Sequence, residues 1–324
     1  MRLPSGFRQI LKPAITAALL ILVFRSVDLD SIRHNLARLN LTLILLLLLA
    51  YWAAQVVSAQ RWRLWARALG MKGAFLPFLR HYFAGMFFGI GFTSLGGDIV
   101  RAYAAARHTG TCLGQGLASA LLDRASGLTT LLLVGSIAIV FHPLAWRGIP
   151  LWILYALGWL AVACTVPALW RMNGRPANPA ADPPGASDTG RKRRLAEFWL
   201  ALTRIHLRRR DLLLIAGLSL VNSGLVIMIV ERMFYVTGAS LTLLAICAAV
   251  PLAEFLAMLP ISVSGLGIRE WSFVALFGSM GIPKDVALSV ALALSGLILV
   301  RNLAGALFVV TAPEAYRAGA ESER

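Results

Sequence analysis

The sequence predicts an all-α, polytopic membrane bundle built from two inverted repeats, and three observations support this prediction. The 324 residues are 58% hydrophobic and 14% charged, whereas soluble domains carry about 25% charged residues. Residues 70–110 reappear 168 positions later, with glycine, serine and arginine at matching places. Six apolar stretches have roughly the 20 residues that a membrane span needs, at 10–27, 39–60, 117–141, 149–170, 212–230 and 286–311.

The first stretch, 10–27, follows a basic start and lacks a clear small-residue cleavage site after it. We therefore expect a retained first helix rather than a signal peptide. Lys and Arg concentrate at three places: three lie before residue 13, five between Arg61 and Arg80, and ten between Arg171 and Arg210. The positive-inside rule assigns these places to the cytoplasm, together with the N-terminus.

This assignment fixes the direction of each later span. The helix at 117–141 leaves the cytoplasm and the one at 149–170 returns, so 76–112 enters and exits on the cytoplasmic side as a re-entrant pair. The span at 212–230 runs outward, and the second copy of the repeat therefore starts from outside. As an alternative, 241–259 spans outright, which gives eight spans with both repeat centres as breaks between them.

We expect one integral membrane domain over residues 1–324, with repeat 1 at about 10–141 and repeat 2 at about 149–311. Between them, 171–211 is a basic cytoplasmic linker, and its part Asn173–Thr189 contains four prolines, a composition typical of disordered, flexible chain. The net charge of +16 follows this membrane asymmetry, so no nucleic-acid partner is expected.

The centre of the first copy has the residues that a broken membrane helix needs. Gly96 and Gly97 allow a sharp turn, and the half-helix that starts there carries a partial positive charge at its N-terminus. Arg101 adds a full positive charge about one turn later, and Ser94 adds a hydroxyl. Such a site suits a phosphate or carboxylate. As the alternative, Arg101 merely neutralises Asp98, three residues before it.

The second copy has a serine, a glycine and an arginine at the places that correspond to Ser94, Gly97 and Arg101. Here too a local neutralisation remains open as the alternative, since Glu270 adjoins Arg269. If the two centres meet, they form one cavity with two fixed cations at membrane depth. The candidate binding residues of this copy are Ser262, Ser264, Gly265, Gly267, Arg269 and Glu270.

Four further ionisable residues lie in apolar stretches, where a charge indicates function by default or else a buried structural pair. They are Asp123, Arg124, Glu254 and Arg301. In an ion-coupled mechanism the carboxylates among them, with Asp98, are candidate proton carriers. The stretch Arg61–Arg67 alternates basic and aromatic residues and is interpreted as an interfacial anchor.

The sequence gives no support for a metal, a cofactor or an enzyme. Cys112, Cys164 and Cys247 stand singly in apolar surroundings, without the spacing of a zinc site or a disulfide framework. No nucleophile elbow or phosphate-binding loop of known pattern is present. We therefore expect a transporter-like protein without cofactors or metals.

The chain resembles the lysylphosphatidylglycerol synthase transmembrane, or flippase-like, family over roughly 10–312. The likeness rests on Leu95–Arg101, on the Asp123-Arg124 pair and most specifically on Leu259–Glu270, which reads LPISVSGLGIRE. The chain differs in having Phe92-Thr93 where the family often has a proline and Asp123 where a glutamate is usual. The resemblance implies movement of aminoacylated lipid between leaflets; because no synthase domain follows, no synthase activity is expected.

From these features we expect a flippase in the bacterial inner membrane, moving an anionic phospholipid or a polyprenyl-phosphate-linked lipid between leaflets. Arg101 and Arg269 would hold the headgroup. Two alternatives stay open. In the first, the protein is a non-transporting partner or scaffold of a lipid- or glycan-modifying enzyme; in the second, it is itself a membrane transferase.

Overall fold

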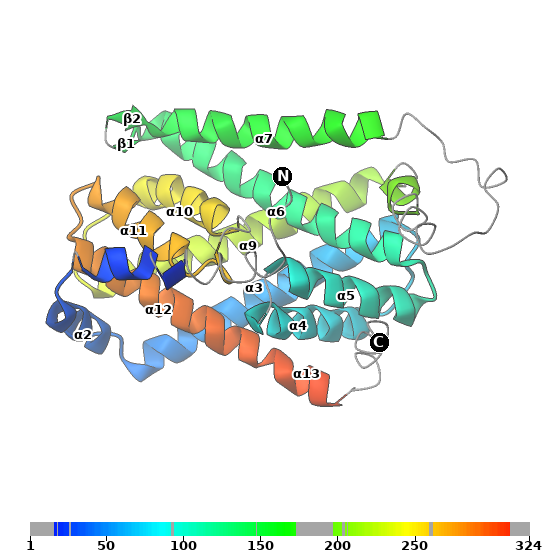
Figure 1. Cartoon of the computed structure of the whole chain (residues 1–324), viewed down its shortest axis with the longest axis horizontal. Coiled ribbons are helices and arrows are strands. Elements are labelled where there is room, and N and C mark those ends of the chain that lie inside the picture. The colour runs from blue at the N-terminus through cyan, green and yellow to red at the C-terminus, as the bar shows by residue number, and fades with distance from the viewer. Residues whose placement is uncertain are drawn as a thin grey trace, which may run out of the picture.

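The computed structural model describes residues 16–17, 19–25, 27–91, 94–146, 148–172, 197–202, 205, 207–258 and 262–311. Long helices run side by side along the longest axis of the molecule (Figure 1). The first half of the chain contains α2 (Leu29–Ala37), α3 (Leu41–Ala68), α4 (Phe75–Gly91), α5 (Ser94–Thr109), α6 (Leu113–Phe141), a short hairpin of β1 (Ala145–Trp146) and β2 (Ile149–Pro150), and α7 (Leu151–Met172). The second contains α9 (Arg209–Val236), α10 (Leu243–Met258), α11 (Ile268–Gly278), α12 (Lys284–Leu303) and α13 (Gly305–Thr311).

Four helices of the described chain are long and apolar enough to cross a membrane: α3, α6, α9 and the combined stretch Lys284–Thr311 formed by α12 and α13. They contain the stretches predicted at 117–141, 212–230 and 286–311 and all but the first two residues of the one predicted at 39–60, so the multi-pass, all-α prediction is confirmed. The stretch predicted at 149–170 forms α7.

Two predictions fall largely on residues outside the described ranges. Of the first span, only residues 16–17 and 19–24 are described as helical. Of the predicted linker 171–211, the stretch 173–196 lies outside them. Residues 197–202 form a short helix whose Ala201 packs with Leu69 and Ala118. The end of the linker thus packs against the bundle.

The two centres predicted from the sequence each fall at or near a junction between two helices. In the first copy α4 ends at Gly91 and α5 begins at Ser94; in the second, α10 ends at Met258 and α11 begins at Ile268. The stretch that could span outright, 241–259, contains α10 with 16 residues. A helix of that length rises about 24 Å, less than the roughly 30 Å of a hydrocarbon core.

The 168-residue offset relates whole helices. It carries α3 onto α9, both of 28 residues, and the start of α4 onto the start of α10. Each long helix is followed two residues later by a glycine of positive φ, Gly70 at 86° and Gly238 at 84°, a conformation that glycine adopts without strain at helix ends. The packing corresponds as well. The offset carries α6 onto the stretch of α12 and α13, and α10 packs on α6 just as α4 packs on α12 and α13.

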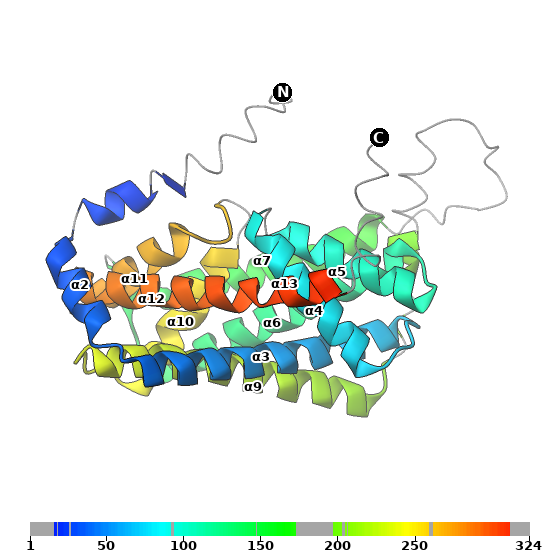
Figure 2. The same ribbon diagram turned by 90° about the horizontal axis from the view of Figure 1, so that it is seen from below.

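The equivalent helices α3 and α9 run antiparallel. Arg38, just before α3, donates from Nη1 to the carbonyl oxygen of Thr237, the residue after α9, at 2.8 Å. Nearer the other ends, Ser58 Oγ donates to Asn222 Oδ1 at 3.0 Å. Figure 2 shows the two helices side by side along the lower edge, with their colour gradients in opposite directions. This arrangement joins the two halves of the chain along α3 and α9.

Candidate functional site

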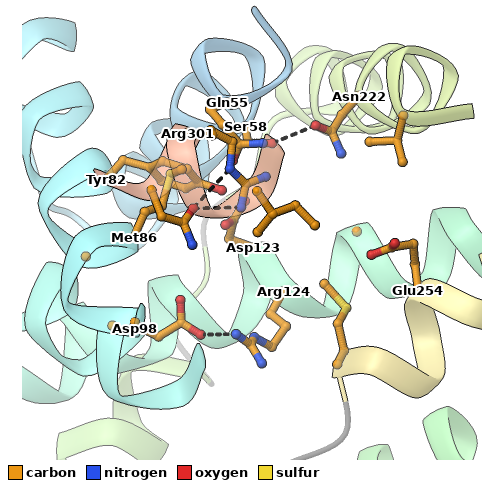
Figure 3. Close-up of a pocket in the computed structure, with 18 of the residues that line it drawn as sticks. Gln55, Ser58, Tyr82, Met86, Asp98, Asp123, Arg124, Asn222, Glu254 and Arg301 are labelled. Carbon is orange, nitrogen blue, oxygen red and sulfur yellow. Dashed lines mark hydrogen bonds and ion pairs between the residues drawn. The ribbon is translucent and has the colours of Figure 1, made fainter. Parts of the chain in front are cut away.

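A cavity of about 260 Å³ lies where the two halves meet, with lining residues from α3, α4, α5 and α6 on one side and α9, α10, α11 and α12 on the other (Figure 3). Arg101 and Arg269, which the 168-residue offset pairs, both line it. The charged residues of the lining are Arg61, Asp98, Arg101, Asp123, Arg124, Glu254, Arg269 and Arg301.

Asp123 on α6 joins two buried arginines in the first half of the cavity. Arg61 Nε donates to Asp123 Oδ1 at 2.8 Å. The Nη1 and Nη2 atoms of Arg101 donate to Asp123 Oδ2 at 3.1 and 3.0 Å. Hydrogen-bonded pairing of this kind is what makes ionised groups tolerable away from water.

Aromatic rings complete the surroundings of Arg101. Its guanidinium carbon lies 4.8 Å from the ring centroid of Trp62 and 4.7 Å from that of Tyr82, within the range of cation–π attraction. Its Nε is buried and has no hydrogen-bond partner among the residues that the structure describes. The guanidinium of Arg101 thus contacts the two rings as well as the carboxylates of Asp123 and Asp98.

Asp98 and Arg124 lie at the more accessible side of the cavity. Asp98 pairs with Arg101 Nη2 at 2.9 Å and with Arg124 Nη2 at 2.6 Å. Their side chains are 20% and 17% exposed, against 6% for Arg101 and 3% for Asp123. Figure 3 shows the Asp98–Arg124 pair below the deeper group around Asp123. The Asp98–Arg124 pair is thus a more exposed side of the cavity, named the mouth below, and Asp123 lies deeper.

In the second half of the cavity, Arg269 on α11 pairs with a carboxylate from α10. Its Nε donates to Glu254 Oε1 at 3.2 Å. The interpretation that Arg269 is neutralised by the adjacent Glu270 therefore needs correction: the ion pair is with Glu254. The matching interpretation for the first copy agrees with the structure, where Asp98 does pair with Arg101.

Glu270 instead supports the break itself. One carboxylate oxygen accepts from the backbone N–H of Gly267 at 2.6 Å, and the other accepts from Ser295 Oγ at 2.6 Å. The first bond closes the N-terminus of α11 in the manner of a capping box. Glu270 is fully buried and does not line the cavity.

Glu270→Ala is expected to lower the free energy of unfolding by about 1–3 kcal/mol, because a buried N–H and a buried hydroxyl lose their charged acceptor. Thermal unfolding in detergent measures the loss, and Glu231→Ala, which removes a partly exposed carboxylate paired with the exposed Arg232, is the control. An equal, small effect of both changes would show that the cap does not hold the break.

The other predicted residues divide between the cavity and the surrounding structure. Gly97, Asp98, Arg101, Ser264 and Arg269 line the cavity, as do the four intramembrane charges Asp123, Arg124, Glu254 and Arg301. The remaining candidates do not line it: Gly96, Ser262, Gly265, Gly267 and Glu270. The side chain of Ser94 lies outside the described part of the structure.

The interfacial-anchor interpretation of Arg61–Arg67 is wrong for its first two residues. Arg61 lines the cavity and is 5% exposed, and Trp62 is fully buried, with Nε1 donating to Ser119 Oγ at 2.9 Å. The helices α6 and α9 pack against this turn of α3, since Trp62 bonds to Ser119 on α6 and Arg61 bonds to Ser219 on α9. Within the described residues, no group of three or more His, Cys, Asp or Glu side chains could hold a metal ion.

These features define a multi-pass helical membrane protein with an arginine-rich cavity between the two halves of the chain. The chain belongs to the family described as the lysylphosphatidylglycerol synthase TM region, whose model matches residues 9–305. No curated protein matches the chain, and no solved structure does.

Proposed function

We propose that the protein is a lipid transporter of flippase type, which moves a lipid with an anionic headgroup between the leaflets of the bacterial inner membrane. The observation that carries the proposal is the excess of cations in the cavity, where five arginines face three carboxylates among the described lining residues. A cationic cavity at membrane depth is costly, and an anionic headgroup would offset that cost.

The arrangement of the halves supports the transport step. The helices α3 and α9 correspond in sequence position and run antiparallel, as elements of an inverted-topology repeat do. We infer that α4–α5 and α10–α11 are its re-entrant or broken pairs, one from each side. Rocking of one repeat against the other would then expose the cavity to each leaflet in turn, with the N-terminus cytoplasmic.

Arg269→Ala is expected to abolish transport while leaving membrane insertion intact, because the change removes a fixed cation from the cavity. Full-length protein in proteoliposomes with a fluorescent phosphatidylglycerol provides the measurement, with externally added reductant reporting the outer leaflet. Normal lipid movement by this variant would overturn the proposal.

Two further variants separate transport from folding. Arg269→Ala with Glu254→Gln removes the ion pair as a unit, so that no carboxylate remains unpaired; it should also fail to transport. Arg232→Ala alters an arginine on the exposed surface and should transport normally. If the wild-type protein moves no lipid and purifies with a lipid- or glycan-modifying enzyme, the scaffold function replaces transport.

A further inference from the structure

Arg301 differs from the other arginines of the cavity in its partners. Its Nε and Nη2 donate to Asn302 Oδ1 at 3.0 and 2.8 Å, and its guanidinium carbon lies 4.7 Å from the ring centroid of Tyr51. Both partners are neutral. Among the described residues no carboxylate forms an ion pair with Arg301, whereas each of the other four lining arginines has one.

The contact with Asn302 also fixes which edge of the guanidinium stays available. An arginine has five N–H donors in a rigid plane. The amide oxygen of Asn302 occupies the Nε–Nη2 edge, so the Nη1–Nη2 edge remains for a further acceptor. That edge can bind two oxygens of one phosphate or carboxylate in parallel.

The charges of the whole cluster indicate how much negative charge the site accepts. The five arginines and three carboxylates of the lining leave two positive charges. Glu270 is linked to Arg269 through Ser295, with Ser295 Oγ 3.5 Å from Arg269 Nη1 and 2.6 Å from Glu270 Oε1. With this carboxylate the cluster carries one positive charge, which a monoanion balances.

The repeat does not duplicate this cation. The 168-residue offset leads from Arg301 back to Leu133, an exposed apolar residue of α6. An anion bound at Arg301 would therefore lie asymmetrically in the cavity, because among the described lining residues only the second half of the chain supplies an arginine without an ion pair. In Figure 3, Arg301 lies in the upper part of the view with Tyr82, away from the Asp98–Arg124 mouth.

We propose that Arg301, held by Asn302, is the primary anchor of a monoanionic phosphodiester group, and that this group belongs to a lipid headgroup. The inference that the phosphodiester belongs to a lipid rests on the proposed transport function and on the apolar residues near Asp98 at the mouth. Leu95 and Ile99, on the same helix as Asp98, are exposed large apolar side chains. In a membrane-spanning protein such side chains contact acyl chains, so a lipid whose headgroup enters through the mouth to reach Arg301 would keep its tails in apolar surroundings.

Native mass spectrometry of the full-length protein with added lipids tests the anchor. Phosphatidylglycerol, a phosphodiester monoanion, should be retained more than phosphatidic acid at alkaline pH, where a phosphomonoester with a second pKa of about 6 is a dianion. Arg301→Gln should weaken retention of phosphatidylglycerol by about tenfold or more, as expected for a lost charge-assisted hydrogen bond. Arg301→Lys, which keeps the charge, should recover part of it.

Arg232→Gln, on the exposed surface, is the matched control and should bind like wild type. Unchanged retention in Arg301→Gln, or tighter binding of phosphatidic acid, would overturn the anchor. Displacement of the lipid by millimolar dimethyl phosphate would show a site for free ions and overturn the lipid source. If Arg301-dependent binding is found but no lipid crosses the bilayer, the anchor stands and the transport proposal fails. If lipid crosses the bilayer and neither its binding nor its transport depends on Arg301, the transport proposal stands and the anchor fails.

Discussion

Asp123→Ala is expected to lower the free energy of unfolding by about 3–5 kcal/mol, the range for breaking one side of a buried ion pair. The carboxylate is buried and accepts from Arg61 Nε and from both terminal nitrogens of Arg101. Its loss leaves Arg61 without a carboxylate among the described residues, while Arg101 keeps Asp98. The uncompensated guanidinium of Arg61 is therefore the main cause of the expected loss.

The melting temperature in detergent and the yield of monodisperse protein measure this effect. Asp30→Ala, at an exposed position of α2, is the control and should change little. The double variant Asp123→Leu with Arg61→Met removes both charges and fills the space with apolar atoms, which is often neutral for a buried pair. Recovery of stability in the double variant is expected; a double variant as unstable as the single one would show that packing, not charge, causes the loss.

The arrangement of helices follows from the sequence because its two signals are simple. A span must be apolar over its length, and similar segments at a constant offset in the sequence indicate elements of similar length at the same offset. The α3 and α9 helices illustrate both, since each is apolar, has 28 residues and is followed by a glycine of positive φ. The same offset correctly paired Arg101 with Arg269, which line one cavity.

The partners of the charged residues were less predictable because they depend on tertiary packing. Glu270 was interpreted as the partner of Arg269 from adjacency alone, yet neighbours along a helix do not face each other. The true partner, Glu254, lies on α10. A signal for the actual role was present, since a glutamate three residues after Gly267 is the position of a helix-capping acceptor.

Arg61 shows a second limit of sequence reasoning. Alternating arginine and tryptophan are typical of the membrane interface, but such local composition does not reveal which other helices surround the segment. In the structure α3 packs against α6 and α9 at this level, and Asp123, 62 positions away in the sequence, provides the counter-charge. Only an estimate of the contacts between these helices could have moved Arg61 from the interface to the cavity.

Gly97→Ala is expected to destabilise the protein by about 1–3 kcal/mol, the usual cost of extra atoms in a packed interior, and to reduce transport. The α4 and α5 backbones touch at this point, so that an added methyl group at Gly97 would overlap the carbonyl oxygen of Gly85. Backbone cannot move aside as a flexible side chain does, and the two helices must separate. Arg101 lies one turn further along α5, so a separation of the two helices is expected to disturb its bonds to Asp123.

Gly89→Ala provides a matched control on the facing helix. An added Cβ at Gly89 meets no atom within 4 Å, and alanine is favoured over glycine inside a helix by up to about 1 kcal/mol. This variant should therefore be as stable as wild type or more so. Gly89 itself lines the cavity, so the two variants are compared in stability alone. If Gly97→Ala equals Gly89→Ala in melting temperature, the close contact of α4 with α5 does not stabilise the protein. In the second copy Gly265 lies against the carbonyl oxygen of Ala257, 2.9 Å from an added Cβ, and has a φ of 80°. Because both the contact and the backbone conformation there disfavour a side chain, Gly265→Ala should have at least the effect of Gly97→Ala, and the pair tests whether the two breaks serve the cavity alike.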